Sequence, residues 1–240
     1  VASNTNYFAY STDGTNWTEG TISSTSRYWI SVCYGNDKFV AISGSFFNTS
    51  QAFAYSTDGI NWTEGAISDT ARNWFAICYG NGMFVTVSWS NYFAYSTDGI
   101  NWTEGTISDT NRQWMSVCYG NDKYIILSQD GYMAYSTDGI TWTEGTISDT
   151  NRGWMSVCYG NDKFVAVAYN SNYFAYSTDG IAWKEVEMES SYKLNSICYS
   201  PDLDIFIAVG PSGFVTIKVP NKWESGTRST FIVEYTWTNN

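Results

Sequence analysis

Short apolar runs separated by turn residues recur along the chain at a nearly constant spacing. In one unit, residues 154–159 (WMSVCY) end at a Gly-Asn-Asp turn, and residues 163–168 (KFVAVA) form an almost continuous apolar run. Residues 173–177 (YFAYS) then lead through an Asp-Gly turn to a run that opens at Trp183. Short runs of this kind between turns are typical of β-strands, and continuous apolar runs indicate strands covered on both faces. The unit therefore predicts four antiparallel strands.

This unit is repeated five times. The tetrapeptide STDG starts at Ser11, Ser56, Ser96, Ser136 and Ser177, in steps of 45, 40, 40 and 41 residues. Such a period is that of the four-stranded propeller blade, and no segment shows the 3.6-residue apolar period of a helical repeat. We therefore predict an all-β, single-domain β-propeller of four-stranded antiparallel blades, with five blades favoured and six as the alternative. The units run near residues 11–55, 56–95, 96–135, 136–176 and 177–217.

The two ends of the chain bear on how the ring closes. Residues 7–19 supply only a third and a fourth strand, and pairing them with the first and second strands at residues 194–209 would unite the chain ends in one blade and remove a sheet edge. Residues 213–218 (GFVTIK) would then be a surplus third strand. The tail, residues 218–240, contains the alternating segment FIVEYTW at 231–237. It could be an added strand, a seal on the ring or a contact with another chain.

Composition and charge narrow the possible partners. Aromatic residues make up 18% of the chain, which suits strands. The net charge of −11, from 12 basic and 23 acidic residues, excludes nucleic acid and an anionic membrane surface as partners. No stretch of about 18 apolar residues exists to span a bilayer. We expect no membrane insertion and no cofactor, and the first residues show no signal peptide.

The five cysteines occur once per repeat. They are Cys33, Cys78, Cys118, Cys158 and Cys198. Equivalent positions in successive blades should lie beyond disulfide reach of about 7 Å between Cα atoms, so we interpret these residues as reduced, small, buried apolar groups. Because the chain has no histidine and no pair of cysteines spaced as metal ligands, we predict no metal site.

The motif Ser-Thr-Asp-Gly-x-x-Trp, present five times at blade spacing, resembles the Asp-box, or bacterial neuraminidase repeat, whose pattern is Ser/Thr-x-Asp-x-Gly-x-Thr-Trp. The resemblance covers most of the chain. Asp and Gly are adjacent here and Trp follows Asp by four positions rather than five, which we interpret as a variant of the same turn. The Asp and Trp of each box are Asp13 and Trp17, Asp58 and Trp62, Asp98 and Trp102, Asp138 and Trp142, and Asp179 and Trp183.

The resemblance implies that the box lies between the third and fourth strands and has a structural role. The physical chemistry of these residues agrees with that role. The Asp side chain can accept hydrogen bonds from its own turn, Gly tolerates positive φ, and Trp can pack between blades with its N–H satisfied. Because the family includes sialidases, other glycosidases, sorting receptors and binding modules, the box indicates the fold and not the chemistry.

The candidate ligand-binding residues lie on the opposite face, where each Arg precedes a Trp by two positions. The pairs are Arg27 and Trp29, Arg72 and Trp74, Arg112 and Trp114, and Arg152 and Trp154. Arg offers a donor fork and Trp a flat apolar face for a sugar ring. The alternative is a surface ion pair with Asp69, Asp109 or Asp149, three residues earlier. The loops after the second strands diverge among the copies, through drift or through ligand contact.

We expect an extracellular microbial or phage surface-binding propeller that is lectin-like and multivalent for a glycan. One alternative is a structural or protein-interaction domain that meets other chains through its C-terminal strand. A second is a sialidase-like glycoside hydrolase. Glycoside hydrolysis needs two carboxyls across one asymmetric pocket, whereas the carboxylates here recur with the repeat, so we predict no catalytic residues and no enzyme activity.

Overall fold

The computed structural model describes residues 6–44, 52–68, 72–148, 152–169, 171–211, 213–219 and 233–234. In this part of the chain every regular element is a β-strand. The chain starts with a two-stranded sheet, which we call the half-blade, formed by β1 (Tyr7–Tyr10) and β2 (Thr18–Thr21). Five four-stranded sheets, called blades 1 to 5, follow in sequence order.

Each blade is a meander of antiparallel strands, and its strands are named first to fourth in chain order. Blade 1 comprises β3 (Trp29–Gly35), β4 (Lys38–Ser43), β5 (Ala52–Ser56) and β6 (Thr63–Ala66). Blade 2 comprises β7 (Trp74–Gly80), β8 (Met83–Ser88), β9 (Tyr92–Ser96) and β10 (Thr103–Thr106). Blade 3 comprises β11 (Trp114–Gly120), β12 (Lys123–Ser128), β13 (Tyr132–Ser136) and β14 (Thr143–Thr146).

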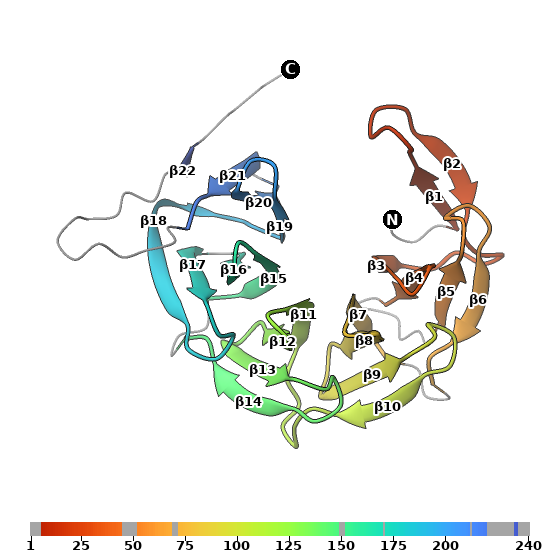
Figure 1. Cartoon of the computed structure of the whole chain (residues 1–240), viewed down its shortest axis with the longest axis horizontal. Helices are drawn as coiled ribbons and strands as arrows, with labels where there is room; N and C mark the ends of the chain where they lie inside the picture. The colour runs from red at the N-terminus through yellow and green to blue at the C-terminus, as the bar shows by residue number, and fades with distance from the viewer. Residues whose placement is uncertain are drawn as a thin grey trace.

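The last two blades follow the same order. Blade 4 comprises β15 (Trp154–Gly160), β16 (Lys163–Ala168), β17 (Ser171–Ser177) and β18 (Lys184–Tyr192). Blade 5 comprises β19 (Ser196–Ser200), β20 (Ile205–Gly210), β21 (Gly213–Ile217) and β22 (Val233–Glu234). The sheets stand around a central axis with their first strands innermost (Figure 1). The predicted fold class, an all-β propeller of four-stranded blades, is confirmed.

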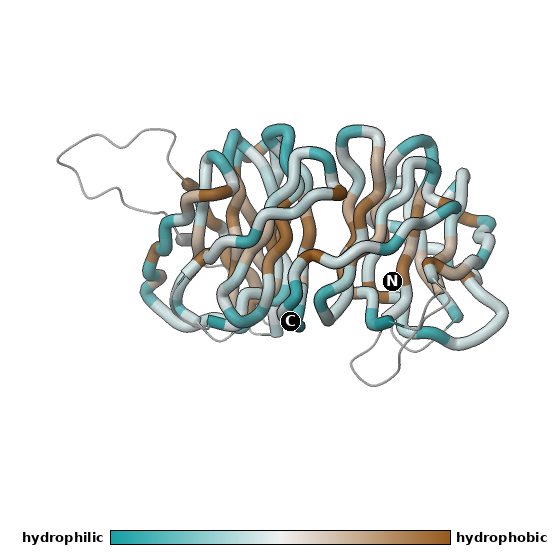
Figure 2. Tube along the Cα trace, turned by 90° about the horizontal axis from the view of Figure 1, so that it is seen from below, coloured by the Kyte–Doolittle hydropathy of each residue, from teal (hydrophilic) through white to brown (hydrophobic). Residues whose placement is uncertain are grey.

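Apolar side chains fill the seams between blades. Trp74 of blade 2 is fully buried against Val40 and Ile42 of the second strand of blade 1. Second strands that lie between two neighbouring sheets, such as β8 and β16, are buried along their length because these sheets cover both faces, whereas β20 of blade 5 is partly exposed. Hydrophobic segments accordingly run through the middle of the disc, whereas the turns on its two faces are hydrophilic (Figure 2).

The ring is open between the half-blade and blade 5 (Figure 1). This corrects the predicted closure, in which residues 7–19 pair with residues 194–209. In the structure β20 pairs instead with β21, and β21 pairs with β22. A third strand that follows immediately in the chain costs less loop-closure entropy than one about 200 residues away. Of the predicted segment 231–237, only residues 233 and 234 lie within the described part of the chain.

Candidate ligand-binding face

The Asp-Gly boxes form compact turns between third and fourth strands. In blade 2, Asp98 Oδ1 accepts hydrogen bonds from the backbone N–H groups of Ile100 (2.8 Å) and Asn101 (2.8 Å) and from the Ser96 hydroxyl (2.9 Å). Gly99 has a φ of +72°, which favours glycine. Equivalent hydrogen bonds occur in the other four boxes, for example from Ile140 N–H to Asp138. The carboxylate of each box is thus engaged by its own turn.

The box tryptophans pack in the seams. The Trp102 ring meets Phe53 of blade 1 edge-on, with ring centroids 5.7 Å apart, and Trp62 meets Phe8 of the half-blade in the same way. Trp17 is 65% exposed because no described blade precedes the half-blade. One expectation is corrected. The buried indole N–H groups have no hydrogen-bond acceptor among the described residues. This applies to Trp62, Trp102, Trp142 and Trp183.

The opposite face, which we call the loop face, carries the segments before the first strands and between second and third strands. The tryptophans predicted to contact a sugar there point into the core. Their exposed fractions do not exceed 2%. This applies to Trp29, Trp74, Trp114 and Trp154. Their ring faces are therefore occupied by core packing and are not available for stacking on a ligand.

The four arginines of the loop face bridge the first and fourth strands of their own blades. Arg72 Nε lies 2.5 Å from Glu104 Oε1, and Arg112 Nε lies 2.8 Å from Glu144 Oε1. Each of these partners is a Glu of a fourth strand, and Asp109, three residues before Arg112, forms no ion pair with it. Asp69 and Asp149 lie outside the described residues. The remaining pairs are Arg27 with Glu64 and Arg152 with Glu185.

A tyrosine outside the Arg–Trp pattern completes three of these clusters. The guanidinium carbon of Arg72 lies 3.4 Å from the centre of the Tyr92 ring, and that of Arg112 lies 3.3 Å from the centre of the Tyr132 ring. The third pair, Arg152 and Tyr173, is 3.7 Å apart. These tyrosines open or lie near the start of the third strands at the repeat spacing, which is the signal that could have identified them.

Blade 1 lacks this tyrosine, and its cluster is looser. Ala52 occupies the position, Arg27 is 32% exposed at the side chain, and its distance to Glu64 Oε2 is 3.5 Å. In blades 2 and 3 the Arg side chains are only 17% and 12% exposed. Stacking on a ring therefore accompanies closer ion pairing, and the loop face has three well-formed Arg–Tyr–Glu clusters and one incomplete one.

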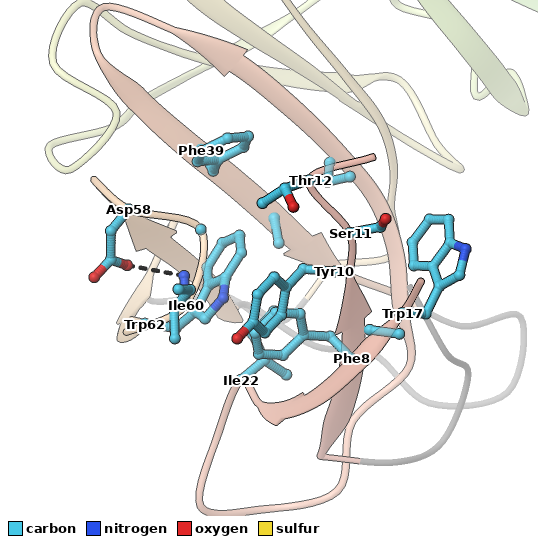
Figure 3. A pocket seen from close by; sticks show the side chains of 14 residues that line it. Phe8, Tyr10, Ser11, Thr12, Trp17, Ile22, Phe39, Asp58, Ile60 and Trp62 are labelled. Carbon is cyan, nitrogen blue, oxygen red and sulfur yellow. Dashed lines mark hydrogen bonds between the residues drawn. The ribbon is translucent and has the colours of Figure 1, made fainter. Parts of the chain in front are cut away.

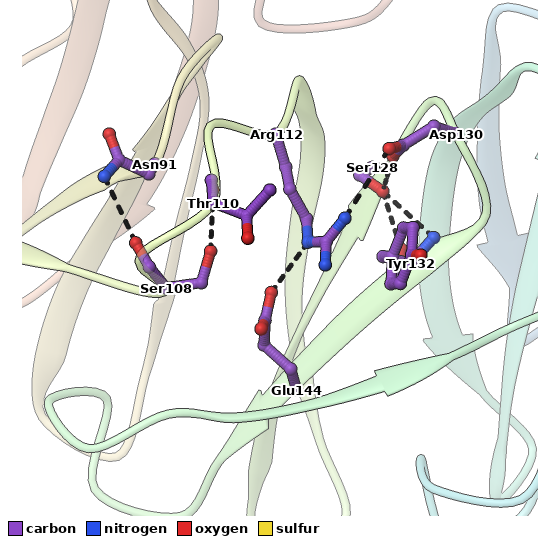
Figure 4. A network of polar contacts seen from close by, with 8 residues as sticks. All are labelled: Asn91, Ser108, Thr110, Arg112, Ser128, Asp130, Tyr132 and Glu144. Atoms are coloured by element: carbon purple, nitrogen blue, oxygen red, sulfur yellow. Dashed lines mark hydrogen bonds and ion pairs between the residues drawn. The ribbon is translucent and has the colours of Figure 1, made fainter.

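The divergent loop of blade 3 contacts the cluster of that blade. In blade 3, Asp130 lies in the loop between second and third strands, and its carboxylate is 3.7 Å from Arg112 Nη1 (Figure 4). The Ser128 hydroxyl donates to Asp130 and accepts from Tyr132 N–H. The loop of blade 3 thus supplies a carboxylate next to the Arg–Tyr–Glu cluster of that blade. Residues 45–51, the longest such loop, lie outside the described residues.

The described residues contain neither a cluster of metal-ligating side chains nor a helix that could span a membrane. No group of three or more Asp, Glu or Cys side chains is placed to hold a metal ion there. Over the same residues, no helix with the length and apolarity needed to cross a bilayer is present.

Solved β-propellers are similar to this chain. Virginiamycin B lyase from Staphylococcus aureus matches with a TM-score of 0.78 and 14% identity, over 88% of this chain and 72% of that chain. A streptogramin B lyase gives 0.78 and 11% over the same shares. YCF48 bound to D1 peptide gives 0.61 and 14%, over 85% and 67%. No family model matches the chain, and no curated protein matches its sequence.

These comparisons correct the expectation that the chain is not an enzyme. Three of the similar structures are of such lyases, so propellers of this shape carry catalysis. Another is of a protein with a bound peptide, so they also bind proteins. At 10–14% identity the likeness is one of fold and assigns no reaction and no ligand to this chain.

Proposed function

We propose that this propeller is a multivalent binding protein of the Asp-box type that acts at an extracellular or virion surface and takes a glycan as its ligand. The observation that carries the proposal is the repetition of one polar cluster, Arg–Tyr–Glu, on the loop faces of blades 2, 3 and 4. A ligand with many identical units is the natural counterpart of several identical sites on one rigid ring.

The chemistry of a cluster suits saccharide hydroxyls. The guanidinium offers several N–H donors, the carboxylate accepts, and the phenol can do both. Ion pairing and stacking already hold these side chains in place, so little conformational entropy is lost when a ligand binds. The aromatic contact comes from half-buried tyrosines instead of the predicted tryptophans. The adjacent divergent loops would then tune which sugar each blade prefers.

A glycan array followed by alanine variants tests this proposal. Each substitution of Tyr92, Tyr132 or Tyr173 should weaken binding to an immobilised polysaccharide, and the triple variant should remove the avidity of roughly 10²–10⁴-fold that several sites confer. Matched controls are Ile100→Ala, Ile140→Ala and Ile181→Ala. These change exposed side chains of the same three blades on the opposite face and should leave binding unchanged. Equal loss in both sets, or no glycan bound by the parent, would contradict the proposal.

Protein binding is the second candidate, and the similarity to a peptide-bound propeller favours it. The C-terminal strand β22 is a two-residue edge strand, where another chain could add a strand. Sedimentation velocity would show an assembly larger than one chain if this edge joins copies. A monomer at all concentrations would restrict this candidate to other proteins as partners.

Catalysis is tested separately. One of the similar lyase structures is an inactive His-to-Ala variant, and this chain has no histidine to take that role. The hydrolase alternative calls for a fluorogenic sialoside assay. Turnover that is abolished by changing a loop-face Glu such as Glu144 would replace the binding proposal with an enzymatic one.

A further inference from the structure

Among the described residues, no first or second strand accompanies the half-blade, whereas each of the five blades has both. Its sheet contains only β1 and β2. Between it and blade 1 lies a cavity of 540 Å³, lined by side chains of both sheets (Figure 3). The apolar part of its lining comes from Phe8, Tyr10, Ile22, Val32, Phe39 and Trp62. A cavity of this size with a mainly apolar lining has room for apolar side chains.

The complete blades show which residues fill the equivalent space. In them a Val or Ile of the preceding second strand lies against the box glycine of the next blade. A Cβ on Gly99 would meet Val40, and one on Gly180 would meet Ile125. At Gly59, next to the half-blade, the three nearest atoms all belong to Phe39 of its own blade. The missing element therefore includes a second strand with an aliphatic residue at this position.

The first strands give a second set of matches. The Tyr of each first strand lies on the last glycine of the preceding one, as Tyr119 does on Gly80 and Tyr159 on Gly120. Tyr34 of blade 1 has no described first strand before it and is 56% exposed. Val32 is 44% exposed, whereas its counterpart Ile77 is 6% exposed.

A hydrogen bond between neighbouring first strands shows which polar residue the missing first strand should carry. Ser31 Oγ accepts from Ile77 N–H at 3.4 Å, and Ser116 Oγ accepts from Val157 N–H at 3.1 Å. The equivalent donor of blade 1 is Val32 N–H. A serine on the missing first strand would accept from it in the same way. The intact seams thus define the positions of a serine, a glycine and an aliphatic residue on the missing element.

We propose that the half-blade and the adjoining side of blade 1 form a docking site for a β-hairpin with the pattern of this chain's own first and second strands. The hairpin adds its second strand to the edge of β1, its serine and glycine meet Val32 and Tyr34, and its aliphatic residues fill the cavity. Strand addition of this kind gains affinity from main-chain hydrogen bonds and specificity from side-chain pockets. All five such hairpins of the described chain already belong to blades 1 to 5.

A synthetic peptide provides the test. A fluorescent peptide with the sequence of residues 154–168 (WMSVCYGNDKFVAVA) is titrated with the full chain and followed by anisotropy. We expect saturable binding with one peptide per chain. A control peptide with aspartate in place of both Val165 and Val167, the residues that face the next blade, should bind at least about tenfold more weakly.

Protein variants locate the site. Val32→Glu places a charge on an exposed side chain of the docking face, so folding is retained while peptide affinity falls at least about tenfold. Ile140→Glu, an equally exposed position on blade 3, should leave affinity unchanged. Equal binding of both peptides, or affinity unaffected by Val32→Glu, would overturn the proposal. A dimer that Val32→Glu dissociates would also overturn it and assign this face to a second copy of the chain.

Discussion

At the scale of single residues, one carboxylate organises each box. Asp98 is half-buried and engaged by two backbone N–H groups, a hydroxyl and the Asn101 side-chain amide. In the half-blade and in blades 1 and 2, an Asn side chain also donates to the second carboxylate oxygen of the box Asp. The equivalent position holds Thr141 in blade 3 and Ala182 in blade 4. The two backbone donors are retained in all five copies, so they define the turn.

Asp98→Ala should lower stability without a direct effect on ligand binding. The turn loses hydrogen bonds with a net value of about 1 kcal/mol, since water replaces part of them at this half-buried site. The melting temperature should fall by roughly 2–4 °C in a chain of this size. Ile100→Ala, in the same turn, is the control and should melt like the parent. An unchanged melting temperature with lost glycan binding would make the box a ligand site.

The cysteines are unpaired, but they are less buried than predicted. Four are half-buried on first strands, and Cys198 of blade 5 is exposed. Burial raises the pKa of Cys33 to about 12, so its reactive thiolate is scarce at neutral pH. We expect a maleimide to label Cys198 first and the other four slowly, as followed by peptide mass spectrometry. Equal rates at all five would contradict this placement, and any Cys–Cys link under non-reducing conditions would contradict the reduced state.

At the scale of elements, the contact between successive first strands depends on a residue without a side chain. Gly35, Gly80, Gly120 and Gly160 each end a first strand under the Tyr ring of the next blade. The fifth first strand ends in Ser200, and no described sheet follows it. A glycine thus ends each first strand that packs against the first strand of a following blade, and a serine ends the one that does not.

Gly120→Ala should be one of the more damaging single changes in the molecule. The added Cβ would fall inside the Tyr159 ring, which has to move, and overpacking of this kind costs about 1–3 kcal/mol. Urea denaturation should show a lower midpoint. Ser200→Ala, at the equivalent position of blade 5, should be close to neutral. Similar midpoints for Gly120→Ala and the parent would mean that the seam is looser than described.

The sequence predicted these elements well because the repeat is strong, and it was less informative about contacts between them. Residues 163–168 coincide with β16, and β15 is one residue longer than predicted. Which Glu pairs with Arg112 depends on the distance between first and fourth strands across a sheet, which spacing along the chain does not reveal. The burial of Trp114 likewise follows from packing between blades, so an Arg–Trp pattern alone could not distinguish core from surface.

At the scale of the whole molecule, the boxes should make stability depend on acid pH. Hydrogen bonds from Thr141 and Ile140 lower the pKa of Asp138 to about 2, against 3.8 for the free side chain. The pKa values of the other four box aspartates are lowered too, although burial opposes the shift at Asp98 and Asp179. As pH falls through 3.8, the unfolded chain binds protons first, so stability present above about pH 4 is lost toward pH 2.

Urea midpoints measured at about pH 7 and about pH 3 would test this dependence. Asp138→Asn removes one titrating group, so its midpoint should fall less between the two pH values than that of the parent. An identical fall in both would assign acid sensitivity to other carboxylates.

The opening in the ring determines the order in which the parts of the molecule unfold. Every seam couples one blade to the next, so cooperativity propagates along a line with two ends and not around a circle. In such a linear array the terminal units fray first, and the free energy of local opening rises toward the middle. Amide exchange should then be slowest in blade 3 and fastest in the half-blade and blade 5. Joining the two ends would abolish this gradient and make the propeller unfold as a single unit.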